Sequence, residues 1–161
     1  SENSALVKGV NRAWDAGLVV VVAAGNNGPR TMSITTPGIS RKVITVGCSD
    51  DDREVLVGGN RMVDYSGRGP TAACICKPDL VAPGCSVVSC SSRADKYTIK
   101  SGTSMSTPIV SGAVALLLER FPDMTNKDVK LRLRESSVDI GLPRNQQGWG
   151  LLDVGKMIGM I

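Results

Sequence analysis

The apolar run at positions 18–24 constrains the fold of this chain more than any other segment. It consists almost entirely of Val, Leu and Ala, and Gly25 and Asn26 close it. A strand of a parallel sheet is buried on both faces and therefore shows such a continuous apolar run. Residues 3–16 in front of it place their apolar side chains on one helical face and are followed by Gly17, a residue type at which helices often end. A helix followed by a buried strand is half of a βαβ unit, so this part predicts an α/β fold.

Other short apolar segments predict further strands. Residues 43–48 resemble a second buried strand, and residues 87–89 and 97–99 predict shorter strands separated by turn-rich polar segments. No internal repeat or low-complexity linker interrupts the order of elements. Residues 1–161 are therefore expected to belong to a single α/β layer structure.

Three helices are expected in the second half of the chain. Residues 104–120 are apolar nearly all round, which in a globular protein predicts a helix buried in the core, and Pro108 falls near its first turn, where proline does little harm. A second helix runs from the capping residue Thr125 to about Ser136. Residues 148–153 predict a turn that leads into a last short helix.

The overall composition argues against two classes of partner. The net charge of +4 comes from 19 basic and 15 acidic residues spread along the sequence, and only 3% of the residues are aromatic, so stacking surfaces for nucleic acid are scarce. No apolar run approaches the roughly 20 residues that a membrane-spanning helix needs. Neither a nucleic-acid nor a membrane partner is therefore expected.

Five cysteines are present, at positions 48, 74, 76, 85 and 90. An odd number in a chain of this size mildly favours reduced thiols in the cytoplasm over a secreted protein, and localisation is otherwise left open. Cys74 and Cys76 are separated by one residue and the chain has no histidine, whereas zinc sites usually combine a wider spacing with a second Cys or His pair. We therefore expect buried structural thiols and assign no metal site to them.

Three segments carry the functional signal: Ala-Ala-Gly-Asn at 23–26, Lys-Pro-Asp-Leu-Val-Ala-Pro-Gly at 77–84, and Ser-Gly-Thr-Ser-Met-Ser-Thr-Pro at 101–108. Together they resemble the subtilisin-like serine proteases (subtilases, peptidase family S8), and the resemblance covers essentially the whole chain. It implies a three-layer α/β fold with a parallel sheet, of which this chain holds only the C-terminal part, and a serine endopeptidase acting on polypeptide substrates.

Ser104 and Asn26 are the candidate catalytic residues. A serine between a loop and a buried helix places its hydroxyl and its N–H at the positive end of the helix, where developing negative charge is stabilised. Ser104 alone could equally be a helix N-cap; the seven-residue motif favours a nucleophile. Asn26 follows a buried strand, so its amide could donate to the oxyanion together with the Ser104 N–H.

Residues beside these two are expected to contact the substrate. By the resemblance, Ala24 and Gly25 form a wall of the pocket for the substrate residue before the scissile bond. Thr103 supplies a hydroxyl that could fix Asn26 or the oxyanion, and we expect it too among the substrate-binding residues. Met105 would lie on the leaving-group side or simply be a core methionine. The turn at Pro83 and Gly84 supplies no reacting group.

The chain contains no histidine, although a serine of this family needs a histidine base oriented by an aspartate. In subtilases the chain order is Asp, His, Ser, so both partners are expected upstream of residue 1. The missing initiator Met and signal segment agree with a fragment or processed product. The isolated chain is expected to be inactive, and its uncovered apolar surface predicts self-association or poor solubility.

Two other interpretations remain. The sedolisins use a glutamate base and share a Gly-Thr-Ser motif, but their oxyanion segment carries Asp where this chain has Asn26. A non-catalytic scaffold or interaction module of the same fold is the second. An α/β-hydrolase is excluded because Ser106 stands where Gly-x-Ser-x-Gly requires glycine.

The run of three aspartates at 50–52 leaves calcium open as a cofactor, although three exposed acids more often form a solvated turn.

Overall fold

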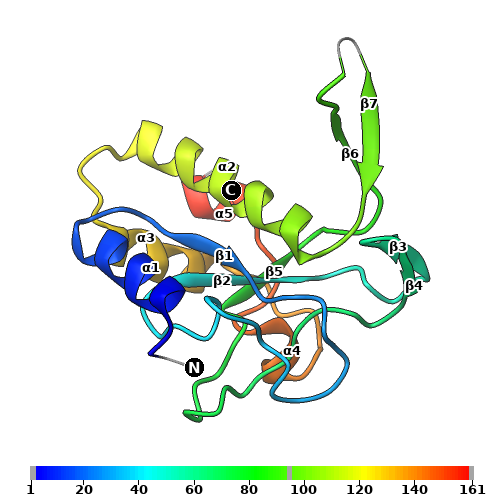
Figure 1. Cartoon of the computed structure of the whole chain (residues 1–161). Helices are drawn as coiled ribbons and strands as arrows, with labels where there is room; N and C mark the ends of the chain where they lie inside the picture. Colours follow the sequence, from blue (N-terminus) through cyan, green and yellow to red (C-terminus); the bar gives the residue numbers. More distant parts are fainter. Residues whose placement is uncertain (1–2, 94–95, 160–161) are drawn as a thin grey trace.

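The computed structural model describes residues 3–93 and 96–159 and shows a mixed α/β fold with a parallel sheet (Figure 1). The predicted α/β class is confirmed. The helices and strands, in chain order, are α1 (Ala5–Asp15), β1 (Val21–Ala23), β2 (Ile44–Cys48), β3 (Val55–Val57), β4 (Asn60–Met62), β5 (Leu80–Ala82), β6 (Val87–Cys90), β7 (Tyr97–Lys100), α2 (Thr103–Arg120), α3 (Asn126–Ser136), α4 (Arg144–Gln147) and α5 (Val154–Ile158).

Three strands that are distant in sequence form the parallel sheet, in the order β1-β2-β5. In the ladders, Val46 of β2 lies opposite Ala23 of β1 and Leu80 of β5. Every residue of β2 and β5 is buried, as the apolar run at 43–48 predicted for β2. Because the strands are parallel, their carboxyl ends meet at one edge of the sheet, where ligands bind in open α/β sheets.

Helix α2 packs across the sheet and, together with α1, α3 and α5, covers one face of it (Figure 1). The opposite face is contacted by loops, since Thr45 Oγ1 donates to the Gly38 carbonyl at 2.7 Å. The main core is formed by Trp14, Ile44, Val46, Leu80, Ala82, Val110, Ala113, Val114, Leu117, Val129, Leu133 and Met157.

The expectation that residues 104–120 form a fully buried helix is wrong for one face. The buried side chains of α2 form one helical face, which includes Val110, Ala113, Val114 and Leu117. Leu116 is 50% exposed. No further layer covers the exposed face within the described residues. Neither α2 nor any other helix within residues 3–93 and 96–159 combines the length and apolarity needed to cross a membrane.

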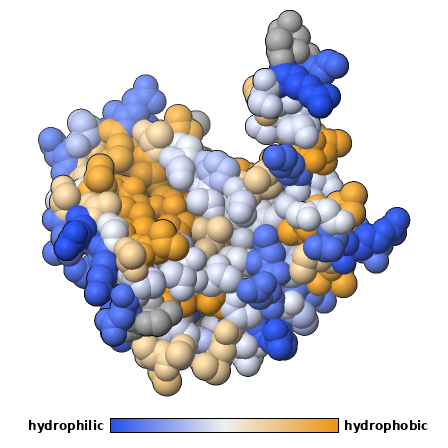
Figure 2. Space-filling view, in the orientation of Figure 1, coloured by the Kyte–Doolittle hydropathy of each residue, from blue (hydrophilic) through white to orange (hydrophobic). Residues whose placement is uncertain are grey.

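Strand β1 is shorter and more exposed than the run at 18–24 predicted. All three of its residues are only half-buried. It pairs with β2 on one side, and its other edge carries no strand in the described part of the chain. Figure 2 shows an apolar area over this region, where Leu18 is 60% exposed and Leu6 of α1 is 63% exposed. This edge is open because no neighbouring strand covers it.

Two antiparallel hairpins project from the sheet. β6 and β7 form the longer arm seen in Figure 1, which agrees with the strands expected at 87–89 and 97–99. β3 and β4 form a shorter hairpin that the sequence analysis missed. Its turn is Gly58-Gly59, and both glycines have positive φ. Two-residue hairpin turns favour this dipeptide, so Gly-Gly was the sequence signal that could have predicted the hairpin. Short helix α4 was also missed.

Candidate active site

Asn26, after the end of β1, contacts Thr103, the residue before Ser104 at the start of α2. After β1 the chain passes through Ala24 and Gly25, the latter at φ +96°, and turns so that Asn26 faces the start of α2. Asn26 Oδ1 accepts hydrogen bonds from Thr103 N at 2.9 Å and from Thr103 Oγ1 at 3.0 Å. Two segments separated by 77 positions are thereby joined at the carboxyl edge of the sheet.

These contacts determine which way the Asn26 amide points. The backbone N–H of Thr103 can only donate, so the Asn26 atom facing it must be the oxygen. The amide nitrogen Nδ2 is then turned away from Thr103, and no group in the described part of the chain accepts a hydrogen bond from it. Asn26 therefore presents two free N–H donors beside the first turn of α2.

Ser104 is the second residue of α2 and is exposed. The N-cap is Gly102, at φ 136°, so the simple interpretation of Ser104 as an N-cap is wrong. Within residues 3–93 and 96–159 no group hydrogen-bonds to the Ser104 hydroxyl. The first N–H groups of a helix lack intrahelical acceptors and form its positive end. The Ser104 N–H and the Asn26 amide thus offer donors in one small region.

The structure corrects two of the predicted substrate contacts. Ala24 and Thr103 are each 0% exposed, so neither has surface that a peptide could touch. Gly25 is half-buried and keeps some surface. Its N–H donates to Thr103 Oγ1 at 3.2 Å, and a side chain there would overlap Thr35. Thr103 therefore holds Asn26 and Gly25 in place. Met105 is half-buried, and its N–H donates a hydrogen bond to the Gly102 carbonyl at 2.8 Å.

The acidic run at 50–52 is not the solvated turn that was expected. Asp51 is 4% exposed and accepts a hydrogen bond from Ser66 N at 2.7 Å, and burial raises the pKa of its carboxyl group. Asp50 accepts hydrogen bonds from the turn after β5. Only Asp52 is exposed to solvent like a surface acid. In the described ranges no group of three His, Cys, Asp or Glu side chains could hold a metal ion.

The cysteines differ from one another in burial. Cys48 is buried at the end of β2, but Cys74, Cys76 and Cys90 are exposed, which corrects the expectation that Cys74 and Cys76 are buried structural thiols. Burial raises the pKa of the Cys48 thiol to about 12, against a smaller opposing effect of its hydrogen bond with Tyr65. Cys48 therefore stays protonated at neutral pH and offers no thiolate nucleophile.

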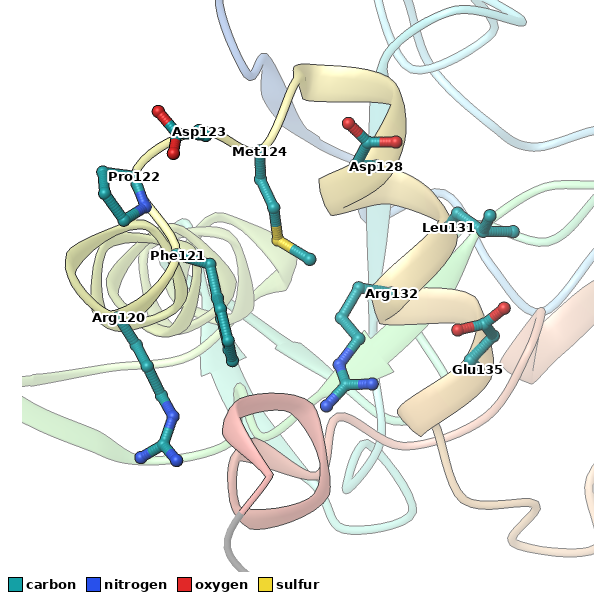
Figure 3. Close-up of a pocket in the computed structure, with 9 residues that line it drawn as sticks. All are labelled: Arg120, Phe121, Pro122, Asp123, Met124, Asp128, Leu131, Arg132 and Glu135. Carbon is teal, nitrogen blue, oxygen red and sulfur yellow. The ribbon is translucent and has the colours of Figure 1, made fainter.

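A cavity of about 600 Å³ lies at the opposite end of α2 from Ser104, between that end and α3 (Figure 3). Its position excludes it from the candidate site, because none of the motif residues lines it. The guanidinium of Arg132 beside it is held by the Met157 carbonyl at 2.7 Å. The lining residues are Arg120, Phe121, Pro122, Asp123, Met124, Asp128, Leu131, Arg132 and Glu135.

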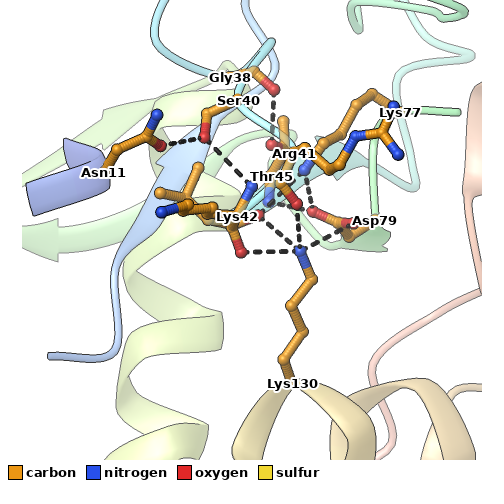
Figure 4. A network of polar contacts seen from close by, with 10 residues as sticks. Asn11, Gly38, Ser40, Arg41, Lys42, Thr45, Lys77, Asp79 and Lys130 are labelled. Atoms are coloured by element: carbon orange, nitrogen blue, oxygen red, sulfur yellow. Dashed lines mark hydrogen bonds and ion pairs between the residues drawn. The ribbon is translucent and has the colours of Figure 1, made fainter. Parts of the chain in front are cut away.

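A buried charge network occupies the amino ends of β2 and β5 (Figure 4). Asp79 Oδ2 accepts hydrogen bonds from Lys77 Nζ at 2.5 Å and from Thr45 N at 2.7 Å, and Lys130 of α3 lies 3.6 Å from Asp79 Oδ1. Lys77 is 1% exposed. Burial lowers its pKa to about 8, although Asp79 partly offsets that effect. The cluster lies at the edge of the sheet opposite to Asn26 and joins β2, β5 and α3 there, so it is not part of the candidate site.

Comparison with known sequences identifies the family. The sequence model described as "Subtilase family" matches residues 1–150. The chain belongs to the subtilase family. This confirms the resemblance carried by the three motifs and leaves the sedolisin alternative without support.

Individual relatives of this subtilase chain are longer proteins. It is 43% identical over 145 residues to "Serine protease AprX" of Bacillus subtilis (strain 168), spanning 82% of this chain and 33% of AprX. It is 33% identical over 137 residues to "Halolysin-like extracellular serine protease Nep" of Natrialba magadii, spanning 85% of this chain and 22% of Nep. The chain thus spans only about a third or less of these relatives.

One solved structure supports the fold of this subtilase chain. The prenylagaramide maturation protease PagA superposes with a TM-score of 0.73 at 24% sequence identity, over 95% of this chain and 54% of that chain. At this identity the likeness concerns the fold alone, and it agrees with the mixed α/β architecture and its parallel sheet.

Proposed function

We propose that this chain supplies the nucleophile and one oxyanion donor of a subtilisin-type serine endopeptidase. One observation carries the proposal: Asn26 is bound through its oxygen to Thr103, so that its free amide lies at the start of α2, where the Ser104 hydroxyl is exposed and unbonded. Membership of the subtilase family and the serine proteases among its relatives support the same reaction.

The reaction follows from this geometry. Ser104 Oγ attacks the carbonyl carbon of the scissile peptide, and its proton passes to a base. The carbonyl oxygen, now negative, accepts hydrogen bonds from Asn26 Nδ2 and from the Ser104 N–H. Collapse of this intermediate transfers the proton to the leaving amine and leaves an acyl group on Ser104, which water then hydrolyses. Gly25 keeps surface beside this point for the substrate residue before the scissile bond.

The base must come from outside this chain, because the sequence contains no histidine. We propose that a histidine and its orienting aspartate belong to another part of the whole protein, whose relatives are considerably longer than this chain. The isolated chain is then inactive, since the Ser104 hydroxyl has no group to remove its proton.

A fluorophosphonate probe tests the assignment on the full-length protein. Its phosphorus forms a bond to an activated serine oxygen, fluoride leaves, and the serine proton goes to the base. We expect covalent labelling of the wild type and none of Ser104→Ala. Ser111→Ala is the matched control, because Ser111 is an exposed serine on the same helix whose hydroxyl only donates to the Thr107 carbonyl. This control should label like the wild type.

Asn26→Ala provides a second arm of the same experiment. Removing an oxyanion donor costs roughly 10²–10³ in kcat, a magnitude that comes from subtilisin itself. KM should change little. Equal labelling of wild type and Ser104→Ala would refute the nucleophile assignment. If the full-length wild type is not labelled at all, the protein is a non-catalytic scaffold of the same fold, the alternative that the missing histidine suggests.

For localisation we propose secretion. One relative is extracellular by its own name. This favours secretion over the cytoplasmic setting that the odd number of cysteines mildly suggested. Detection of the full-length protein in the culture medium rather than in washed cells is the corresponding measurement.

A further inference from the structure

The carboxylate of Asp50 reaches from the end of β2 to the turn after β5. Asp50 Oδ1 accepts hydrogen bonds from the N–H groups of Gly84 at 2.8 Å and Cys85 at 3.1 Å. The thiol of Cys48 lies 3.1 Å from the same oxygen. β2 and β5 are parallel neighbours, so the residues after their carboxyl ends are adjacent in space. One charged oxygen therefore holds two consecutive amides of the turn.

The same turn holds the amino end of α2. The Gly84 carbonyl accepts a hydrogen bond from Gly102 N at 2.9 Å, and Tyr65 Oη lies 3.4 Å from it. Gly102 is the N-cap of α2 and stands two positions before Ser104. A side chain at Gly84 would overlap the hydroxyl of Ser106, which is buried in the first turn of α2. The turn and the helix start are therefore in direct contact, with no space between them.

We propose that Asp50 is a positioning residue for Ser104. The start of α2 is held at two consecutive amides: Gly102 N bonds to Gly84, which Asp50 fixes, and Thr103 N bonds to Asn26. The first N–H groups of a helix need such outside acceptors. Asp50 contacts neither Ser104 nor the oxyanion donors and acts through the turn that begins at Gly84. This inference rests on the proposed function, because it assigns a role to Asp50 in that reaction.

Four variants of the full-length protein test it by peptide hydrolysis. Asp50→Ala removes the acceptor, Asp50→Asn keeps an oxygen in place without the charge, and Asp50→Glu keeps the charge but displaces the oxygen by one methylene. Asp52→Ala is the matched control from the same acidic run, since the Asp52 side chain is 80% exposed and only faces Arg53 at 4.0 Å.

For Asp50→Ala and Asp50→Glu we expect kcat to fall by roughly 10- to 100-fold with little change in KM, because a displacement of about 1 Å at a reacting group can cost on the order of 100-fold. Asp50→Asn should retain more activity than Asp50→Glu, since position matters more than charge in this role. Asp52→Ala should have wild-type kcat. Thermal unfolding verifies that each variant is folded.

Wild-type kcat in folded Asp50→Glu would overturn the proposal, and so would an Asp50→Asn variant that is slower than Asp50→Glu. If Asp50→Ala does not fold, Asp50→Glu decides the matter by the same criterion. The failure of the proposed function would give a different result from the failure of the positioning role. If the proposed function is wrong, Ser104→Ala is labelled like the wild type. If only the positioning role is wrong, Ser104→Ala remains unlabelled and Asp50→Glu has wild-type kcat.

Discussion

Thr103 links the two candidate functional residues although its side chain has no exposed surface. Its hydroxyl donates to Asn26 Oδ1 and accepts the Gly25 N–H, and its own N–H also donates to Asn26. The orientation of the Asn26 amide, and hence its availability as a donor, depends on this one threonine. The sequence motif suggested that the Thr103 hydroxyl could fix Asn26, which agrees with this hydrogen bond, but it also placed Thr103 among the substrate-binding residues.

Thr103→Val should therefore affect both stability and catalysis. The substitution preserves shape but leaves the Gly25 N–H without its acceptor, which costs roughly 1–3 kcal/mol of unfolding free energy. We also expect a lower kcat in the full-length protein, because Asn26 loses one of its two anchors. Thr107→Val, one turn along α2, is the control: its hydroxyl only donates to the Thr103 carbonyl at 2.9 Å. Urea unfolding measures the loss of stability, and steady-state kinetics measure the loss of kcat. If Thr103→Val and Thr107→Val lost the same stability and the same kcat, the anchoring role of Thr103 would be contradicted.

At the scale of elements, the network around Asp79 ties β2, β5 and α3 together at the edge opposite to the candidate site. Lys77 Nζ donates to the Val43 carbonyl at 2.9 Å as well as to Asp79, and Lys130 Nζ donates to the same carbonyl at 2.9 Å. Burial lowers the pKa of Lys130 as it lowers that of Lys77, against the opposing attraction of Asp79. The ammonium form of both lysines is therefore disfavoured in the folded chain.

The pH dependence of stability follows from Lys77. Its pKa falls from 10.5 in the unfolded chain to about 8 in the folded one, so between these values the unfolded chain binds more protons. Stability then rises with pH across this window, by at most about 3 kcal/mol. Burial of the Cys48 thiol acts in the opposite direction above pH 9.

The difference between wild type and Lys77→Met isolates this effect, because Cys48 is common to both proteins and cancels. Urea unfolding at several pH values should show the wild type gaining stability relative to Lys77→Met between pH 8 and 10.5. Lys127→Met, an exposed lysine of α3, should show no such change. A pH-independent difference for Lys77→Met would show that the lysine is not destabilised by burial.

At the scale of the whole molecule, the chain leaves apolar surface uncovered. Strand β1 has a free edge, and Leu18, Leu6 and Leu116 of α2 are exposed. Figure 2 shows a broad apolar area on this face of the molecule. An open strand edge beside apolar surface is a template for association with another chain. In the whole protein we propose that another segment covers this surface.

We predict that the isolated 161-residue chain self-associates. Sedimentation velocity should show dimers or larger species whose proportion increases with concentration. Leu116→Lys places a charge on the outer face of α2 and should reduce the association. Leu131→Lys, at an exposed leucine of α3, is the control and should not. A compact monomer at all concentrations would contradict this prediction.

The sequence by itself determined the local elements and the family. The apolar run at 43–48, the helical period at 3–16 and the Gly-Thr-Ser-Met motif are local patterns, and they predicted β2, α1 and the placement of Ser104 correctly. Only the tertiary structure decided which side chains meet. Asn26 and Thr103 are separated by 77 positions, and Asp50 and Gly84 by 34. Such contacts depend on the order of strands in the sheet, which no local pattern encodes. For the same reason, α2 has an exposed face: composition shows how apolar a helix is, but packing decides what covers it.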